Sequence, residues 1–181
     1  MTALAIRRAV AGDARGVARV HVDSWRTTYA GIIPDRVVVG LSVDDKAASW
    51  RQIIAAQARR DAVLVASAAG AGIVGYASVG PAQSLADRFA GELYTLYVLT
   101  DWQNRGVGRA LLQASFAFLA AAGMGSAFAW VLADNPARFF YQAVGGRWSG
   151  ERDERLWGAD LHQIAYGWPD LGAWLAEKDA T

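Results

Sequence analysis

Apolar residues recur along this chain with two spacings, one typical of strands and the other of helices. Continuous or alternating apolar runs indicate strands, because successive side chains of a strand point to opposite faces. Apolar residues three and four positions apart indicate amphipathic helices. The pattern predicts strands at residues 5–9, 62–67, 73–79, 92–99, 126–133, 147–153 and 161–167. It predicts helices at residues 14–30, 42–60, 107–122 and 136–144.

Turn and capping residues support the ends of these elements. Gly12 and Asp13 precede the first helix, Ser42 is a good N-terminal cap for the second, and Gly145 with Gly146 ends the last. The resulting order is β-α-α-β-β-β-α-β-α-β-β. It predicts an α/β fold of the α+β kind, a mixed sheet with helices on both faces. The 181 residues fit one domain, residues 1–181.

The composition is that of a globular protein and argues against several classes. The chain is 54% hydrophobic and 19% charged, too apolar for a disordered chain, and it has no run of about 18 apolar residues to span a membrane. A formal net charge of +1, without a basic stripe, argues against nucleic acid as a partner. The first residues lack the pattern of a signal peptide, so we expect a cytoplasmic protein.

The absence of cysteine excludes some chemistry. With no cysteine there is no disulfide, no thiolate metal site and no cysteine nucleophile. The two histidines, His21 and His162, lie far apart in the sequence, so we expect no metal site.

Two glycines follow an apolar strand and open a helix in the stretch TDWQNRGVGRALLQ, residues 100–113. Glycine in a helix is unfavourable by about 1 kcal/mol relative to alanine, so Gly106 and Gly108 need a reason. A helix N-terminus after a strand is a ready anion site. The P-loop string is absent, and Leu111 stands where a dinucleotide-binding motif needs its third glycine. What remains is the pattern Q/R-x-x-G-x-G/A at residues 103–108, or a tight turn that binds no ligand.

The wider sequence resembles the GNAT superfamily of acyl-CoA N-acyltransferases. The resemblance rests on ELYTLYVLTDWQNRGVGRALL and on NPARFFYQAVGG one strand later, and the element order extends it over nearly the whole chain. It implies the GNAT fold, with acetyl-CoA as co-substrate. Leu96 and Val98 would pair with the pantetheine arm through their backbone, and the amides of residues 104–109 would surround the pyrophosphate. The implied cofactor-binding residues are Leu96, Val98, Gln103, Asn104, Arg105, Gly106, Val107, Gly108, Arg109 and Asn135.

Transfer to an amine also needs a base. A lysine-like amine is neutral in only about one molecule in ~10³ at pH 7, so a group must take its proton. We expect this of Glu92, which opens an otherwise apolar strand eleven residues before Gln103, where the protein-lysine branch of the superfamily has its catalytic glutamate. Alternation predicts that Glu92, Tyr94, Leu96 and Val98 share one face of the strand. The alternative is a strand-edge glutamate that meets solvent or pairs with an arginine.

The departing thiolate needs an acid, and the resemblance implies Tyr141. It matches the tyrosine that many GNAT enzymes use to protonate the thiolate of coenzyme A. The alternative is a core aromatic residue beside Phe139 and Phe140. One departure from the family pattern is Gly146, where an aromatic residue often follows the terminal glycine. The resemblance also implies that the amide of Leu96 stabilises the oxyanion.

The acceptor side is less defined by the sequence. His21, Trp25 and Tyr29 lie four residues apart on one helix stripe, so Trp25 and Tyr29 could bind the substrate, together with Tyr94. Trp50 is a further candidate, and core packing is the alternative for these aromatic residues. Residues 152–155 are predicted to form a solvated loop, with contacts to the substrate as the alternative. A small amine, such as a polyamine or an amino sugar, is the expected acceptor.

The sequence therefore predicts an N-acetyltransferase that acts by direct attack in a ternary complex. The alternatives are an acyl-CoA sensor without turnover, an acetyltransferase for protein lysine or N-terminal amines, and a scaffold that docks a partner through some of its eight tryptophans. The fold is often homodimeric, so a homodimer is possible on this ground alone.

Overall fold

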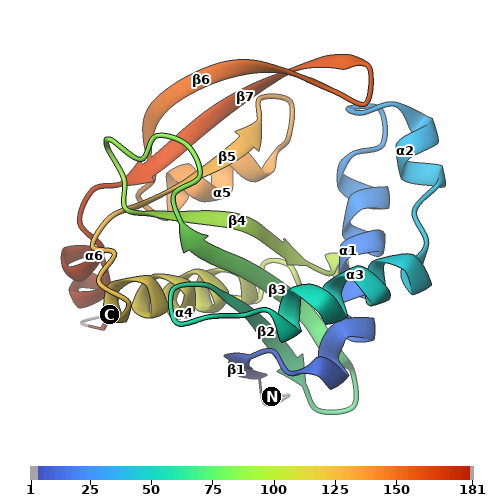
Figure 1. Cartoon of the computed structure of the whole chain (residues 1–181), viewed down its shortest axis with the longest axis horizontal. Helices are drawn as coiled ribbons and strands as arrows, with labels where there is room; N and C mark the ends of the chain where they lie inside the picture. The colour runs from blue at the N-terminus through green and yellow to red at the C-terminus, as the bar shows by residue number, and fades with distance from the viewer. Residues whose placement is uncertain (1–3, 180–181) are drawn as a thin grey trace.

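A single seven-stranded sheet forms the centre of the molecule (Figure 1). The structure is a computed structural model and describes residues 4–179. The strands are β1 (Leu4–Arg8), β2 (Ala62–Ala68), β3 (Gly72–Pro81), β4 (Gly91–Val98), β5 (Ala127–Leu132), β6 (Arg147–Leu156) and β7 (Ala159–Trp168). Their order in the sheet is β1-β2-β3-β4-β5-β7-β6. All neighbouring strands are antiparallel except β4 and β5, which are parallel.

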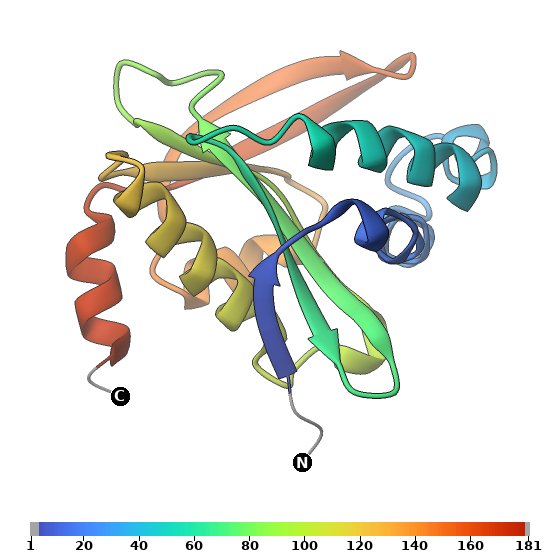
Figure 2. The same cartoon turned by 60° about the horizontal axis from the view of Figure 1, so that its bottom comes forward.

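Helices cover both faces of the sheet (Figure 2). The helices are α1 (Ala14–Thr28), α2 (Asp35–Val39), α3 (Val43–Ala55), α4 (Val107–Ala121), α5 (Ala137–Ala143) and α6 (Leu171–Asp179). Two 3-10 turns, η1 (Ala11–Asp13) and η2 (Thr100–Trp102), precede α1 and α4. Helices α4 and α6 lie on one face of the sheet, and α1 and α3 lie on the other (Figure 2). The mixed sheet and the element order confirm the predicted fold class.

The two faces explain why β2 and β3 are nearly continuous apolar runs. On the α4 side, Leu111 and Phe116 pack in one cluster with Val79. On the α1 side, Val17 packs in another cluster with Val65. A strand that is buried on both faces has no polar side, so its sequence does not alternate.

The structure corrects two of the predicted boundaries and adds two helices. The second long helix ends at Ala55 rather than near residue 60, because Gln57 donates to the carbonyl of Ile54 and accepts from the amide of Val63. The polar stretch expected as a loop is strand, since β6 runs through residues 152–155 and turns only at Trp157 and Gly158. Helices α2 and α6 were not predicted.

The sheet opens between its two parallel strands. β4 and β5 are paired only at Gly91 with Ala127 and at Glu92 with Phe128. Beyond these pairs β4 continues against β3, while β5 continues against β7. The residues of β4 from Tyr94 to Tyr97 are therefore only half-buried, although the strand is central in the sheet.

A β-bulge lies at the start of this opening. Between the pairs Val79–Leu93 and Ser78–Thr95, β4 has one extra residue, Tyr94. A bulge shifts the alternation of side chains along its strand. Leu93, Leu96 and Val98 consequently pack in the same cluster as α4. The expected shared face of Glu92 with Leu96 and Val98 is thus wrong.

No helix among residues 4–179 is both long and apolar enough to cross a membrane.

Candidate functional site

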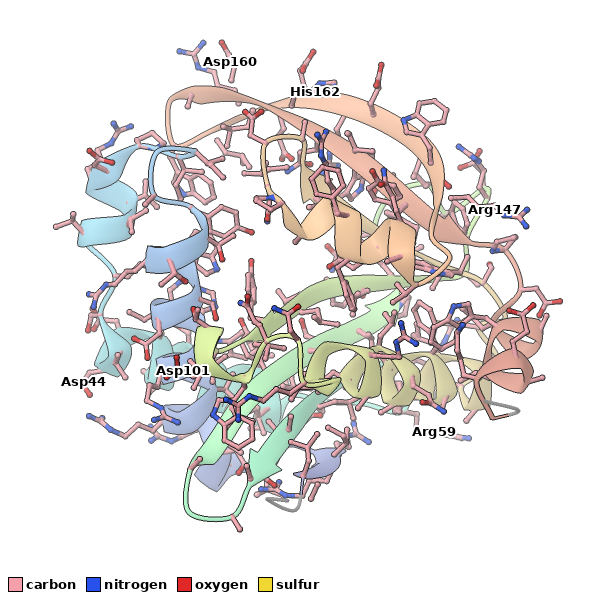
Figure 3. All side chains as sticks on the ribbon, turned by 180° about the vertical axis from the view of Figure 1, so that it is seen from behind. Asp44, Arg59, Asp101, Arg147, Asp160 and His162 are labelled. Atoms are coloured by element: carbon pink, nitrogen blue, oxygen red, sulfur yellow. The ribbon has the colours of Figure 1, made fainter. Side chains whose placement is uncertain are left out.

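The opening between β4 and β5 belongs to a cavity of about 950 Å³. Its walls come from β4, β5, the turn before α4, the start of α5 and the end of α1. Figure 3 shows these elements from behind, with Asp101 marking the turn η2 that leads into α4. Among the residues predicted for the site, the following line the cavity: Tyr29, Tyr94, Leu96, Val98, Gln103, Asn104, Gly106, Gly108, Arg109, Asn135 and Tyr141. Trp25, Glu92, Arg105 and Val107 do not line it.

The edge of β4 along this cavity can bind an extended chain. A strand whose neighbour has diverged presents N–H and C=O groups without a strand partner. Leu96 and Val98 lie on this edge, and both line the cavity. Their backbone is therefore placed to pair with a ligand in the manner of an added strand.

The turn before α4 leaves the N-terminus of the helix open. Gly106 is the N-cap residue, in the left-handed conformation at φ 81°, and no side chain caps the helix. The amide of Ala110 donates to the carbonyl of Gly106 at 3.0 Å, so the amides before Ala110 fall outside the helical ladder. Asn104 also has a positive φ, 58°. Residues 103–106 are exposed. The turn is thus an accessible row of amides at the positive end of a helix dipole.

Glycine occupies the two positions of this turn for different structural reasons. Gly106 needs its freedom for the left-handed backbone. Gly108 does not, because a Cβ built there would meet only ordinary contacts, the ring of Phe140 at 3.5 Å and Leu96 Cδ2 at 3.8 Å. Packing within the chain therefore leaves room for a side chain at Gly108. The missing side chain widens the cavity that Gly108 lines.

The flanking residues hold the turn in place or remain in solvent. The Gln103 side-chain amide donates to the carbonyl of Val98 at 3.1 Å and ties the turn to the end of β4. Arg105 is exposed, with its guanidinium 5.5 Å from the Trp102 ring centroid. The Val107 side chain is buried in the core, so this residue offers the cavity only its backbone. Arg109 is exposed at the cavity wall.

Asn135 lies at the opposite wall, where β5 leads into α5. Its side chain is buried, and Oδ1 accepts from the amide of Ala137 at 2.8 Å. This bond satisfies the amide of the first residue of α5 and fixes the position of the Asn135 side chain. Tyr29, at the C-terminal end of α1, lies close to the side chain of Asn135, which opposes the rise that burial causes in the pKa of Tyr29. The contact brings α1 to the start of α5 across the cavity.

Tyr141 is buried at the cavity wall on α5. Its ring packs against Phe140 and Trp168, with centroids 5.5 Å and 6.0 Å away. No hydrogen bond ties its hydroxyl to another residue in the described part of the chain. Burial, with a smaller contribution from nearby Tyr29, raises the pKa of Tyr141 far above its ordinary value of 10. The phenol is therefore protonated at neutral pH and free to donate into the cavity.

Glu92 lies beside the cavity rather than on its wall. It is 8% exposed, and its Oε2 accepts from the amide of Gln83 at 2.8 Å. Its register partner Phe128 packs with Phe89 and Ala165, on the face of the sheet opposite to Tyr141. Burial raises the pKa of the Glu92 carboxyl, and this outweighs the opposing hydrogen bonds and the charge of Arg152.

The end of α1 is an aromatic wall. Trp25 stacks on His21 at 5.0 Å and meets Tyr29 edge-on at 4.9 Å. The Tyr29 hydroxyl is hydrogen-bonded to the Tyr97 hydroxyl at 3.0 Å. Trp25 itself is covered by Trp157 from the β6–β7 turn, with ring centroids 5.7 Å apart. Trp25 therefore supports the wall from behind, while Tyr29 and Tyr97 face the cavity.

Two other expectations for the acceptor side are corrected. Trp50 is a core residue, 6% exposed and packed edge-on against Tyr76 at 4.9 Å. Residues 152–155 form part of β6 rather than a loop. Arg152 donates to Gln163 at 2.7 Å and lies 4.3 Å from the Trp130 ring centroid.

Several lining residues were missed from the sequence. The residues not predicted include Ser24, Thr27, Thr28, Thr95 and Trp130. Ser24 and Thr28 fall on the apolar stripe of α1, so their spacing suggested a core face. A hydroxyl group on such a stripe is the signal that could have marked a polar cavity. In the described part of the chain, no group of three or more metal-ligating side chains lies together.

Comparison with known proteins gives the site a family. Residues 22–145 match the model of the Acetyltransferase (GNAT) family. The chain is 38% identical over 168 residues to "Uncharacterized N-acetyltransferase YuaI" of Bacillus subtilis (strain 168), covering 93% of this chain and 94% of that one.

Solved structures of similar fold include two with ligands. PaiA N-acetyltransferase of Thermoplasma acidophilum, in complex with coenzyme A, has a TM-score of 0.64 at 19% identity and covers 90% of this chain and 98% of its own. The yncA protein of Salmonella typhimurium, with acetyl-CoA, has a TM-score of 0.65 at 22% identity and covers 92% of this chain and 94% of its own.

Proposed function

Because the chain belongs to the GNAT family of acetyltransferases, we propose that it transfers the acetyl group of acetyl-CoA to the amine of a small molecule, by direct attack in a ternary complex. The observation that carries this proposal is that three features border one cavity. A free strand edge, an open helix N-terminus and a protonated tyrosine all border it.

The residues present fit coenzyme A. The backbone of Leu96 and Val98 would hold the pantetheine arm, and the amides between Asn104 and Arg109 would hold the pyrophosphate. Gln103 keeps that turn against β4, while the exposed Arg105 and Arg109 supply positive charge beside it. The buried amide group of Asn135 faces the same space from α5. Similar folds bind coenzyme A in PaiA and acetyl-CoA in yncA, which supports this assignment.

Acetyl-CoA supplies an activated thioester, and the side chains manage the protons. The amine nitrogen forms a bond to the thioester carbonyl carbon, and the carbon–sulfur bond breaks. Tyr141 donates its proton to the departing sulfur. Glu92 takes the proton of the amine through water, since its carboxylate lies beside the cavity. The amide of Leu96 would stabilise the negative carbonyl oxygen of the intermediate.

Direct attack follows from the composition of the chain. A cysteinyl-acyl intermediate needs a cysteine, and the chain has none. The opening through the sheet also suits a ternary complex. Tyr141 lies on the face that carries α4, whereas Glu92 lies on the other face. The two substrates could therefore approach from opposite faces. The cytoplasmic location and the homodimer stay predictions from the sequence.

Release of thiol from acetyl-CoA tests the proposal. The assay would use saturating acetyl-CoA and a panel of polyamines, amino sugars, amino acids and lysine peptides. A thiol-reactive dye reports only on coenzyme A, because the chain has no cysteine. Release that depends on a small amine supports the proposal. Release with lysine peptides alone, or with none of the amines, contradicts it.

A bulky side chain in the turn tests where coenzyme A binds. Gly108→Trp fills the space beside Phe140, and we expect calorimetry to detect no coenzyme A binding by a protein that still folds. Gly125→Trp is the control, since a Cβ there meets nothing within 4 Å and the residue lies beyond the far end of α4. Unchanged affinity in Gly108→Trp would refute the proposed pyrophosphate site.

A further inference from the structure

The lining of the cavity carries almost no charge. Arg109 is the only lining residue with a charged side chain in the described part of the chain, and it belongs to the turn assigned to the pyrophosphate. No aspartate or glutamate of residues 4–178 lines the cavity. A second ammonium group of an acceptor would find no counter-ion there, and burying an unpaired charge is costly. A polyamine is therefore a poor match.

Hydroxyl groups take the place of charges. Nine lining residues carry one, and they are Ser24, Thr27, Thr28, Tyr29, Tyr94, Thr95, Tyr97, Thr100 and Tyr141. A hydroxyl has one donor and two acceptor positions, so a hydroxyl already bonded within the protein can still accept from a ligand. Tyr94, for example, donates to the carbonyl of Pro81 at 2.6 Å and keeps its acceptor capacity. Such a wall complements a ligand that carries hydroxyl groups of its own.

Ser24 gives this wall a hydroxyl group that has no hydrogen-bond partner within the described part of the chain. It is 4% exposed and lines the cavity, and its Oγ has no hydrogen-bond partner among the described residues. Buried polar groups are nearly always satisfied, so the unpartnered Oγ of a cavity-lining serine points to a polar ligand.

Trp130 adds an apolar surface to the same cavity. Its indole N–H donates to Ser84 Oγ at 2.9 Å, so the polar part of this side chain is already satisfied. Arg152 lies against the ring at 4.3 Å from its centroid. The ring therefore offers the cavity its apolar carbon atoms, against which a small saturated ring can pack.

From these observations we infer that the acceptor is a hydroxylated monoamine, the class of amino sugars and amino alcohols, and that Ser24 binds one of its hydroxyl groups. This inference rests on the proposed transfer to a small amine and narrows its substrate. It assigns to Ser24 a role in specificity, with Thr28 one helical turn further along the same wall.

Three matched amines test the inference. Glucosamine has hydroxyl groups on a six-membered ring, cyclohexylamine has such a ring without hydroxyl groups, and spermidine carries several ammonium groups. The measured quantity is kcat/KM per concentration of free amine, because the three amines differ in pKa. We expect the highest value for glucosamine. A higher value for spermidine or for cyclohexylamine would overturn the inference.

Variants then test whether the preference for glucosamine comes from the hydroxyl groups of Ser24 and Thr28. Ser24→Ala should lower kcat/KM for glucosamine about fivefold to thirtyfold, mainly through KM, as loss of one hydrogen bond predicts. It should leave the value for cyclohexylamine within about twofold. Thr28→Val provides a second removal of a hydroxyl at nearly constant shape. Ser115→Ala is the control, since Ser115 is a buried helix serine that donates to Leu111 and does not line the cavity. Equal loss for both amines would overturn the role of Ser24.

Direct binding separates this inference from the proposed function. Calorimetry would add glucosamine or spermidine to the protein loaded with coenzyme A. Binding of glucosamine without turnover of any amine would refute acetyl transfer and support the hydroxylated pocket. Turnover of other amines without binding of glucosamine would support acetyl transfer and refute the pocket.

Discussion

The hydroxyl of Tyr141 is one of the few polar groups at the cavity wall without an internal partner. Its burial keeps it protonated far above neutral pH. Phe140 and Trp168 hold its ring, so the hydroxyl is positioned by packing alone. A residue fixed in this way can lose its hydroxyl without losing its place.

We therefore expect Tyr141→Phe to reduce kcat by about 10²–10⁴-fold while the Kd of coenzyme A stays nearly constant. The measurement combines thiol release with calorimetry. Tyr166→Phe is the control, because Tyr166 stacks on Tyr141 at 6.2 Å but does not line the cavity. Near-normal turnover in Tyr141→Phe would remove this residue from the mechanism.

Glu92 is testable through pH. Its pKa is raised by burial, so as a base it would be ionised only above that raised value. The rate of the wild type should then fall as the pH drops through this pKa. Glu92→Gln, which can still accept from the amide of Gln83, should lower the rate and remove this limb of the pH–rate profile. An unchanged profile would point to another base.

The same substitution has an opposite effect on stability. A carboxyl whose folded pKa is raised destabilises the fold once the pH exceeds its unfolded value of about 4.5. We expect Glu92→Gln to unfold at a higher denaturant concentration than the wild type at pH 7. A loss of activity together with a gain of stability would separate chemistry from misfolding.

At the scale of elements, the turn into α4 contains one glycine that needs a positive φ, Gly106, and one that does not, Gly108. Gly106 has φ 81°, where a side chain costs about 1 kcal/mol or more. We expect Gly106→Ala to lower the free energy of unfolding by about this amount in denaturant titrations. Gly108→Ala should not lower it, because alanine is favoured in a helix and its Cβ has room. Equal stability of Gly106→Ala and wild type would contradict the left-handed cap.

Elements with strong local signals could be predicted from the sequence. All seven strands and the long helices follow from apolar spacing, and Gly106 and Gly108 marked the turn into α4. The hairpin of β6 and β7 was cut short because residues 151–155 are all charged, which hides the alternation of a half-exposed strand. Its turn at Trp157 and Gly158, both with positive φ, is the signal that was overlooked.

The positions of backbone groups that line the cavity could be predicted from the order of the elements. The direction of side chains could not be predicted where it depends on how the strands pair. Leu96, Val98 and the glycine turn needed only their place in the order of elements. The face of Glu92 required knowledge of the bulge at Tyr94, which appears only when β3 and β4 are paired. The wall formed by Ser24 and Thr28 required knowing that part of the α1 stripe faces a cavity instead of the sheet.

At the scale of the whole molecule, His21 makes stability depend on pH. Burial, with a contribution from Lys46, lowers the pKa of His21 from 6.5 to about 4. Its folded pKa lies below its unfolded value, so the unfolded chain takes up a proton first as the pH falls. The stability that neutral His21 contributes is complete above about pH 6.5 and is lost between pH 6.5 and 4.

The free energy of unfolding should decrease over this range by up to about 3 kcal/mol through His21. We expect His21→Gln, which can still bond with the hydroxyl of Tyr76, to show a flatter profile in denaturant titrations between pH 4 and 7. The His162 pKa is raised by Asp153 at the surface, so His162→Gln is the control that should keep the slope. A slope that survives in His21→Gln would assign it to other groups.

The β6–β7 hairpin brings a late part of the sequence against α1 and α2. β6 is an edge strand of the sheet, and the turn of the hairpin lies beside α2 (Figure 1). There Trp157 packs on Trp25, and Arg36 donates to the carbonyl of Trp157. The aromatic wall is thus supported by residues more than a hundred positions apart.

The divergence of β4 from β5 also determines which backbone amides of the sheet can exchange with solvent. β1 to β4 form one hydrogen-bonded half and β5 to β7 another, with pairs between them only at Gly91 and Glu92. Amide protons on the free edge of β4 can exchange with deuterium without any opening of the sheet, while those between β2 and β3 cannot. A pantetheine arm lying along that edge would protect them and join the halves. The bound substrate would then take the place of a strand between β4 and β5. The local opening of one half of the sheet would be coupled to that of the other half only while the substrate is bound.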